Sequence, residues 1–320
     1  MAGKDSDCVL VADVGGTNTR LAVATADGLR ASGVTSVPNA RYDSFDAVVT
    51  EYLASQAPMT PSACCIAIAG PVTSDRARLT NRDWRFDGAA LSARLGSAKV
   101  HLINDLAALG YAMPGLQDDQ INALVAGPMP ARNDQLLVVG IGTGFNVCLT
   151  KLGQGAVPVV VQAELGHSSL PSTLADPLAE VLGGRTRLPA TVEALCSGRG
   201  LSALHSMISS VGAKSAQQIL AAYEAGTDPL AQRTVDFAAE LLGRYAREMV
   251  CFYLPLGGIV FAGSVARGIL GSGAHQRFLA GFNAPDHLVQ DVPGISVGLI
   301  VDDAAALTGC LRYLRGNMSA

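Results

Sequence analysis

The feature that most constrains the fold is a glycine-rich turn between two apolar segments near the N-terminus. The turn reads Asp13-Val-Gly-Gly-Thr-Asn18 and separates an expected strand at 8–14 from a second at 20–26. Walker and Rossmann loops place their glycines before a helix, and the chain contains no Gly-x4-Gly-Lys-Ser/Thr motif. We therefore predict a β-hairpin. Its bare amides could bind an anion, although Gly-Gly is also a common hairpin turn without a ligand.

The same layout recurs further along the chain. Gly142-Thr-Gly144 lies between expected strands at 136–141 and 147–151, and a third apolar strand within 258–263 ends at a glycine. Gly140-x-Gly142-x-Gly144 lacks the third glycine of a dinucleotide-binding loop at the required spacing. This repetition favours turns that bind a ligand over ordinary glycine turns that recur by chance.

Strands alternate with helical patterns along the whole chain. Further strands are expected at 64–69 and 100–103, and helices at 43–57, from 106 to 113, at 229–253 and at 302–314. The 229–253 segment follows an Asp-Pro start signal and is expected to have an inner apolar face that includes Phe252. This alternation indicates an α/β fold with strongly buried sheets, and 320 residues suggest two domains.

Composition excludes several functional classes. Hydrophobic residues make up 49% of the chain and the net charge is −4, which argues against disorder and against nucleic acid or an anionic membrane as partner. The uncharged, apolar stretch 249–266 is interrupted by Pro255 and glycines, so we expect no membrane span. The N-terminus shows no cationic leader before an apolar core and a small-residue cleavage site, so we also expect no signal peptide. Seven cysteines without a Cys-x-x-Cys pair predict buried, reduced thiols in a cytosolic protein and no structural zinc.

The turns and several other segments resemble a known family. Asp13–Arg20 and Gly142–Gly144 are similar to the paired phosphate loops of the hexokinase/actin-like ATPase fold, and Gly258–Gly263 is similar to its adenosine loop. Further segments in the same order resemble the bacterial glucokinase family over about residues 9–310: Ile66–Val72, Thr80–Trp84, Ile103–Asp105, Glu164–His167 and Val192–Gly198. The related repressor/open-reading-frame/kinase family has a cysteine-rich zinc motif after its histidine, whereas Ser168-Ser-Leu-Pro-Ser follows His167 here.

The resemblance implies a two-domain fold with an interdomain cleft and an ATP-dependent phosphorylation of glucose at its 6-hydroxyl. We expect residues 1–106 with 301–320 to form a small domain, and 107–300 a large one. Magnesium would arrive with ATP and be held by Asp13 through a water. The expected ATP-binding residues are Asp13, Gly15, Gly16, Thr17, Asn18, Gly142, Thr143, Gly144, Gly263 and Ser264.

The resemblance also implies a sugar site. Asp105 would be the catalytic base, although by position alone it could be only the N-cap of the following helix. Glu164 and His167 alone could be a metal pair, but a glycine-containing loop without a third ligand argues against this. Trp84 is expected in the core rather than against a ligand. The expected sugar-binding residues are Asn104, Asp105, Glu164, His167 and Glu193.

Four residues at three places depart from the family pattern. Phe145-Asn146 replaces Leu-Gly after the second phosphate turn, Ser264 replaces a glycine, and Leu165 replaces a common glycine. Phosphate turns bind through backbone amides. We therefore expect Asn146 and Ser264 to alter nucleotide affinity and to leave sugar recognition unchanged.

Two other functions stay open at this point. The chain could phosphorylate another hexose, such as mannose, fructose or an amino sugar, or it could be a non-catalytic sugar-binding sensor on the same fold. A serine hydrolase is disfavoured because no Gly-x-Ser-x-Gly motif occurs. The phosphoryl donor and the oligomeric state, with a homodimer as one alternative, are not decided by the sequence.

Overall fold

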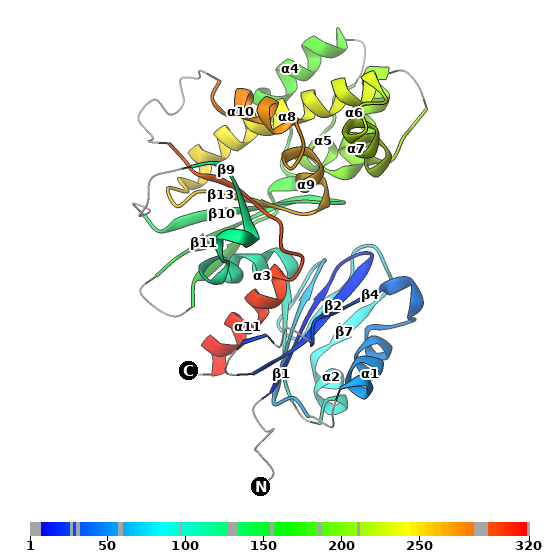
Figure 1. The fold of residues 1–320 in the computed structure, drawn as a ribbon, viewed down its shortest axis with the longest axis vertical. Helices are drawn as coiled ribbons and strands as arrows, with labels where there is room; N and C mark the ends of the chain where they lie inside the picture. Colours follow the sequence, from blue (N-terminus) through cyan, green and yellow to red (C-terminus); the bar gives the residue numbers. More distant parts are fainter. Residues whose placement is uncertain are drawn as a thin grey trace. The chain divides into compact units, whose positions relative to one another are not determined.

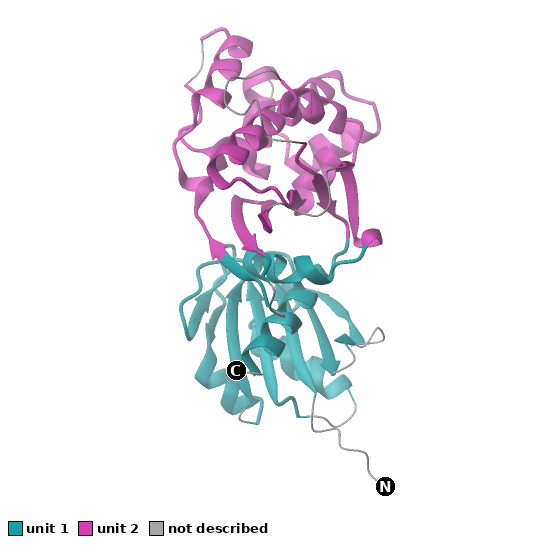
Figure 2. Cartoon of the chain, turned by 90° about the vertical axis from the view of Figure 1, so that its left-hand side faces the viewer, with its two compact units in different colours: residues 1–117, 152–160, 302–320 teal, residues 118–151, 161–301 magenta. Residues whose placement is uncertain are grey.

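The computed structural model describes residues 8–25, 28–29, 33–56, 60–96, 98–126, 133–153, 157–184, 187–209, 212–284 and 294–318. The chain forms two compact units, shown in different colours in Figure 2. Unit 1 comprises residues 1–117, 152–160 and 302–320, and unit 2 comprises 118–151 and 161–301. Among the described helices, none combines the length and apolar character that a membrane span requires.

Unit 1 is built on a mixed sheet in the order β3-β2-β1-β5-β8, with β4 also paired to β2. The strands β1, β5 and β8 are parallel, and β2 is antiparallel to β1. A separate hairpin pairs β6 with β7. The bounds are β1 Val9–Val14, β2 Asn18–Thr25, β3 Gly28–Leu29, β4 Thr35–Pro38, β5 Ala63–Ile68, β6 Arg76–Arg78, β7 Arg85–Asp87 and β8 Lys99–Asn104.

Each face of this sheet is covered by helices, because alternate side chains of its strands enter different cores. Leu10 and Ile66 pack with helices α1 and α2, whereas Val11 and Cys65 pack with α3 and α11 (Figure 1). Trp84 is 3% exposed in the first of these cores, which confirms the expectation that it is a core residue. The helices are α1 Phe45–Ser55, α2 Gly88–Arg94, α3 Asp105–Ala112 and α11 Ala305–Met318, with short 3-10 turns at Asn39–Arg41 and Met113–Gly115.

Unit 2 has a second mixed sheet in the order β12-β11-β10-β13-β14-β9. Here β10, β13 and β14 are parallel, and the neighbours β11 and β9 are antiparallel to β10 and β14. The bounds are β9 Ile121–Val125, β10 Gln135–Ile141, β11 Phe145–Lys151, β12 Val159–Gln162, β13 Ile259–Ala262 and β14 Val297–Ile300.

The helices of unit 2 surround the long helix α8, which packs closely along α10 (Figure 1). Asp228 caps α8 through its side chain, and Pro229 occupies the first turn, as expected from the sequence. Phe252, expected on the inner face, is instead 54% exposed. The helices are α4 Ser172–Leu182, α5 Val192–Cys196, α6 Gly198–Ser209, α7 Ala216–Glu224, α8 Pro229–Tyr253, α9 Ser264–Leu270 and α10 His275–Phe282, with 3-10 turns at Asp118–Gln120 and Leu165–His167.

Both predicted glycine hairpins are present. β1 and β2 pair from Val9 opposite Ala24 to Val14 opposite Thr19, and β10 and β11 pair up to Ile141 opposite Phe145. The cysteines fit their prediction less completely. Five of them are buried, but Cys196 is half-buried and Cys251, on the outer side of α8, is exposed.

Candidate active site

A buried amide outside the glycine motif holds the tip of the β1–β2 hairpin. The Asn39 side chain donates from Nδ2 to the Gly15 carbonyl at 2.8 Å and accepts from the Thr19 hydroxyl at 2.7 Å. The Asn39 backbone N–H donates to the Thr17 carbonyl at 2.8 Å, and the Gly15 N–H closes the turn onto Asn18 at 3.0 Å. Asn39 is fully buried, so it fixes the turn from behind and leaves Thr17 exposed. Sequence reasoning missed this residue.

Asp13 is the last residue but one of β1, beside this turn, and lies in a charged network. The Arg20 guanidinium approaches Asp13 at 3.4 Å and Asp303 also at 3.4 Å. Burial raises the pKa of Asp13, and the positive charge of Arg20 acts in the opposite direction. Asp13 is therefore a half-buried carboxylate whose charge is balanced by the neighbouring cation Arg20.

Asn104, at the end of β8, is the N-cap of α3. Its side-chain oxygen accepts from the Leu106 and Ala107 amides at 3.0 and 3.3 Å, and its nitrogen donates to the Gly70 carbonyl at 3.3 Å. The alternative role for Asp105 as the N-cap is therefore wrong, because the preceding residue already caps the helix. Asp105 is the first residue of α3.

The environment of Asp105 suits proton transfer. One carboxylate oxygen accepts from the Leu106 amide at 2.9 Å. Burial, followed by the negative charge of Asp13, raises the pKa of Asp105 to about 7. A carboxyl group that titrates near neutrality can accept a proton from a hydroxyl and be ionised at physiological pH.

In unit 2, the second glycine turn is fixed by backbone contacts. The Gly142 N–H donates to the Gly144 carbonyl at 3.0 Å, and the Gly198 N–H at the start of α6 donates to the Gly142 carbonyl at 2.8 Å. The third turn also needs its glycine. Gly263 has a φ of +100°, and a Cβ there would collide with the Ile141 carbonyl oxygen. The departure at Ser264 lies one residue later, with its side chain exposed.

Glu193 lies directly beside the second turn. It is the second residue of α5, and its Oε2 accepts from the Phe145 amide at 3.1 Å. Its Oε1 accepts from Arg199 at 2.9 Å. A Cβ at Gly144 would lie 2.6 Å from Oε2, so the glycine is what allows the carboxylate to approach the turn.

Glu164 directly precedes the 3-10 turn Leu165–His167 and His167 is its last residue, and both side chains are largely exposed to solvent. Their side chains are 76% and 69% exposed, and His167 Nε2 lies 3.8 Å from Glu164 Oε2. The same Oε2 accepts from Asn146 Nδ2 at 3.0 Å. Because Phe145 contacts Glu193 and Asn146 contacts Glu164, the start of β11 brings these carboxylates to one place.

Asn146, expected to act on the nucleotide, contacts the segment expected to bind sugar. Position 146 lies on β11 after the turn, and its side chain contacts Glu164 and Leu165, which belong to the segment expected to bind sugar. The glycine spacing of the motif could not reveal this contact, because it joins residues 18 and 19 positions apart in the sequence.

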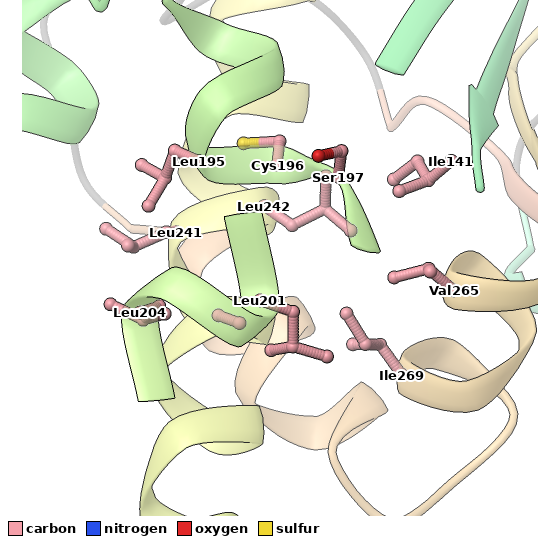
Figure 3. Close-up of a pocket in the computed structure, with 11 residues that line it drawn as sticks. Ile141, Leu195, Cys196, Ser197, Leu201, Leu204, Leu241, Leu242, Val265 and Ile269 are labelled. Atoms are coloured by element: carbon pink, nitrogen blue, oxygen red, sulfur yellow. The ribbon is translucent and has the colours of Figure 1, made fainter. Parts of the chain in front are cut away.

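A small apolar cavity lies behind the turns of unit 2 (Figure 3). Ile141 before the second turn, Ser197 before Gly198 and Val265 after Ser264 contribute to its lining, together with leucines of α5, α6 and α8. Its volume of about 20 Å³ has room for about one water molecule. The cavity is therefore part of the packing that supports the turns.

The expected site residues thus form two groups, each described within its own unit. In unit 1 the hairpin tip, Asp13, Asn104 and Asp105 lie at the same end of the sheet, where β1 and β8 terminate. In unit 2 Glu164, His167 and Glu193 gather at the start of β11, next to the second turn.

Comparison with known proteins identifies the family. The glucokinase family model matches residues 10–317, which is nearly the whole chain. The chain belongs to the glucokinase family. A family member from Cupriavidus pinatubonensis, a glucokinase, is 30% identical over 320 residues, covering 97% of this chain and 93% of the relative.

Solved structures agree with this assignment. A glucokinase from an Antarctic psychrotroph has a TM-score of 0.80 at 26% identity, and the match covers 97% of this chain and 99% of that one. A ROK family glucokinase from Streptomyces griseus, solved in complex with glucose and AMPPNP, has the same fold at 18% identity, with a TM-score of 0.64 and coverage of 97% and 99%. The predicted α/β fold of the hexokinase/actin-like type and the predicted kinase family are confirmed.

Proposed function

We propose that this glucokinase-family enzyme transfers the γ-phosphoryl group of ATP to the 6-hydroxyl of glucose, giving glucose 6-phosphate and ADP. The observation that carries the proposal is the environment of Asp105: a half-buried carboxyl directly after β8, not used as the helix cap, with its pKa raised to about 7. Family membership supports the reaction type, and the Streptomyces griseus structure, named for its glucose and AMPPNP complex, supports these substrates.

Asp105 would accept the proton of the sugar 6-hydroxyl as that oxygen attacks the γ-phosphorus. Asn104 would contact a sugar hydroxyl with its side chain while still capping α3. Glu164, His167 and Glu193 would bind other hydroxyls, because carboxylates and imidazole can accept and orient O–H groups. Closure of the site around the sugar would exclude water, which competes with the 6-hydroxyl for the phosphoryl group.

The glycine turns would bind the phosphates of ATP through backbone amides. The donor set of unit 1 also fits the magnesium that accompanies ATP. Burial, followed by the negative charge of Asp13, raises the pKa of Asp105, and a hard cation with oxygen ligands would relieve the repulsion between the two carboxylates. Asp13 would hold the ion through a water, and the ion would supply charge neutralisation on the phosphates. We further propose that the protein acts in the cytoplasm.

Asp105→Asn tests the proposal. We expect kcat to fall about 10²- to 10⁴-fold while the glucose Kd, measured by calorimetry, stays within about twofold. In the wild type, kcat should fall as the pH drops below about 7, because the base becomes protonated. Asp119→Asn, an exposed residue of the turn Asp118–Gln120, is the matched control and should leave both constants unchanged.

A hexose panel in a coupled ADP assay separates the alternatives. Glucose should give a higher kcat/KM than mannose, fructose or glucosamine if the proposal is right. A wild-type protein that binds glucose but turns over none of these sugars would contradict it and favour a sugar-binding sensor. An Asp105→Asn variant that kept most of its turnover would remove Asp105 from the role of base.

A further inference from the structure

Asn146 contacts the segment that carries Glu164 through both the nitrogen and the oxygen of its side-chain amide. Nδ2 donates to Glu164 Oε2 at 3.0 Å, and Oδ1 accepts from the Leu165 amide at 3.0 Å and from the Val147 amide at 2.9 Å. One side chain therefore holds the Glu164 carboxylate and the backbone next to it. Asn146 is itself fixed, because it lies half-buried on β11 and pairs with Gly140 of β10.

This contact decides the orientation of a carboxylate that would otherwise be free to rotate. The Glu164 side chain is 76% exposed, and a flexible glutamate loses rotamer entropy when a ligand orders it. Within the described part of the chain, both contacts of the carboxylate, with Asn146 and with His167, are made by Oε2. Oε1 is left as an acceptor for a hydroxyl group.

The neighbouring residue supports the second carboxylate in a parallel way. The Phe145 amide donates to Glu193 Oε2 at 3.1 Å, and its ring is packed in the core against Tyr245. Two consecutive residues at the start of β11 thus hold two carboxylates. The Phe145 contact uses backbone and tolerates many side chains, whereas the Asn146 contact requires an amide.

We propose that Asn146 is a positioning residue for sugar recognition, which orients Glu164 so that Oε1 accepts from a hexose hydroxyl. This inference rests on the proposed function, because it assigns Glu164 to the sugar. It replaces the expectation that position 146 tunes nucleotide affinity. Asn146 acts through Glu164 and needs no contact of its own with the substrate.

Asn146→Asp isolates the contact. The variant keeps an oxygen that can accept from the Leu165 and Val147 amides, but it replaces the donor to Glu164 with a second carboxylate. We expect glucose Kd to rise about 10- to 100-fold, the usual effect of losing a hydrogen bond to a charged group. ATP KM should change less than about twofold. Asn283→Asp makes the same chemical change at an exposed position after α10 and should leave glucose Kd unchanged.

A double-mutant cycle with Glu164→Gln distinguishes positioning from general support of the loop. If Asn146 acts through the Glu164 carboxylate, Asn146→Asp should weaken glucose binding strongly in the wild-type background but less than about threefold in the Glu164→Gln background. The glutamine amide in that background can donate to the new aspartate, so the pair is no longer repulsive. A purely structural role would give the same fold-change in both backgrounds. Asn146→Ala takes the place of Asn146→Asp in the cycle if the latter does not fold.

The outcomes separate this inference from the proposed function. Equal effects in both backgrounds, or an unchanged glucose Kd in a variant of a protein that phosphorylates glucose, would overturn the positioning role alone. A change in ATP KM without a change in glucose Kd would restore the nucleotide interpretation. A wild-type protein that does not phosphorylate glucose would overturn the proposed function, and calorimetry with glucose would still decide whether Asn146 positions Glu164.

Discussion

At the scale of single residues, adjacent polar side chains at the end of β8 divide two tasks. Asn104 satisfies the first amides of α3 and reaches back to Gly70. Asp105 accepts from the Leu106 amide and also has a hydrogen bond with the Asn104 side chain, and these contacts lower its pKa by less than burial raises it. Because the capping interaction falls to the neutral residue, the charged residue can keep a raised pKa, and a raised pKa is what a general base at neutral pH requires.

That raised pKa predicts a pH-dependent stability. The carboxyl has an ordinary pKa of 3.8 and a folded-state pKa of about 7, so ionising it costs more in the folded protein than in the unfolded chain. Its stabilising contribution is complete below about pH 4 and is lost as the pH rises to about 7. Asp105→Asn should therefore raise the free energy of unfolding by about 1–3 kcal/mol at pH 8, less than full burial would give because the site is partly solvated, and by almost nothing at pH 4.

Urea unfolding of both proteins at pH 4 and pH 8 measures this difference. Asp119→Asn serves as the control, since that side chain is exposed. A gain that is equal at both pH values, or a loss at pH 8, would show that the folded protein does not destabilise the ionised form of Asp105.

At the scale of elements, the β1–β2 hairpin depends on a residue from outside its own strands. Asn39→Ala removes the partner of the Gly15 carbonyl and of the Thr19 hydroxyl, at about 1–3 kcal/mol for each buried group left unpaired. If this turn binds phosphate, ATP KM should rise about tenfold or more, and glucose Kd should change little.

Steady-state kinetics for ATP and calorimetry for glucose check this prediction. Asn39→Asp is the informative second variant, because it keeps the acceptor for Thr19 but loses the donor to Gly15. We expect it to share the ATP defect. If the glucose Kd rose as much as the ATP KM, the hairpin would have no specific role in nucleotide binding.

Elements that local signals define were predicted well from the sequence. Glycine turns between apolar strands, the Asp228-Pro229 helix start and the strand before Asn104 depend on neighbouring residues. The short edge strands β4 and β9 were missed because they become strands by pairing with β2 and β14. Their own sequence patterns do not indicate a strand. Tertiary pairing of this kind leaves no periodicity in a short segment.

The candidate site follows the same division. The carboxylates and glycines expected to bind ligand could be named from motifs, although their roles stay predictions. Asn39 could not be found, and the contact of Asn146 with Glu164 could not be foreseen, because each acts by a side-chain contact over 18 or more positions in the sequence. A buried or half-buried asparagine has no spacing rule; only the fold shows which backbone groups or carboxylates it meets.

At the scale of the whole molecule, helix α11 near the C-terminus packs against strands from the N-terminal part of the chain. The last helix, α11, packs against β1, β5 and α3 of unit 1, and buries Leu307, Cys310 and Leu314 completely. Cys310 also donates to the Ala12 carbonyl at 3.6 Å. The core of unit 1 therefore includes α11, and the helix that carries Asp105 depends on this packing.

Gly309→Ala tests how far the last helix supports the site. A Cβ at Gly309 would collide with the Ala108 carbonyl oxygen of α3, so α11 and α3 must separate. We expect a loss of stability of about 1–3 kcal/mol or more. Because α3 begins at Asp105, kcat should also fall. Gly212→Ala is the control, since a Cβ there meets no atom within 4 Å.

Amide hydrogen exchange shows which elements the Gly309→Ala substitution destabilises. In Gly309→Ala, amides of β1, β5, α3 and α11 should lose protection, while those of α8 and α10 in unit 2 keep theirs, because each unit has its own core. If α8 lost protection to the same degree, the two units would unfold together, and the last helix would stabilise the entire chain. Selective loss in unit 1, with a lower kcat, would show that the C-terminal helix acts on the base through α3.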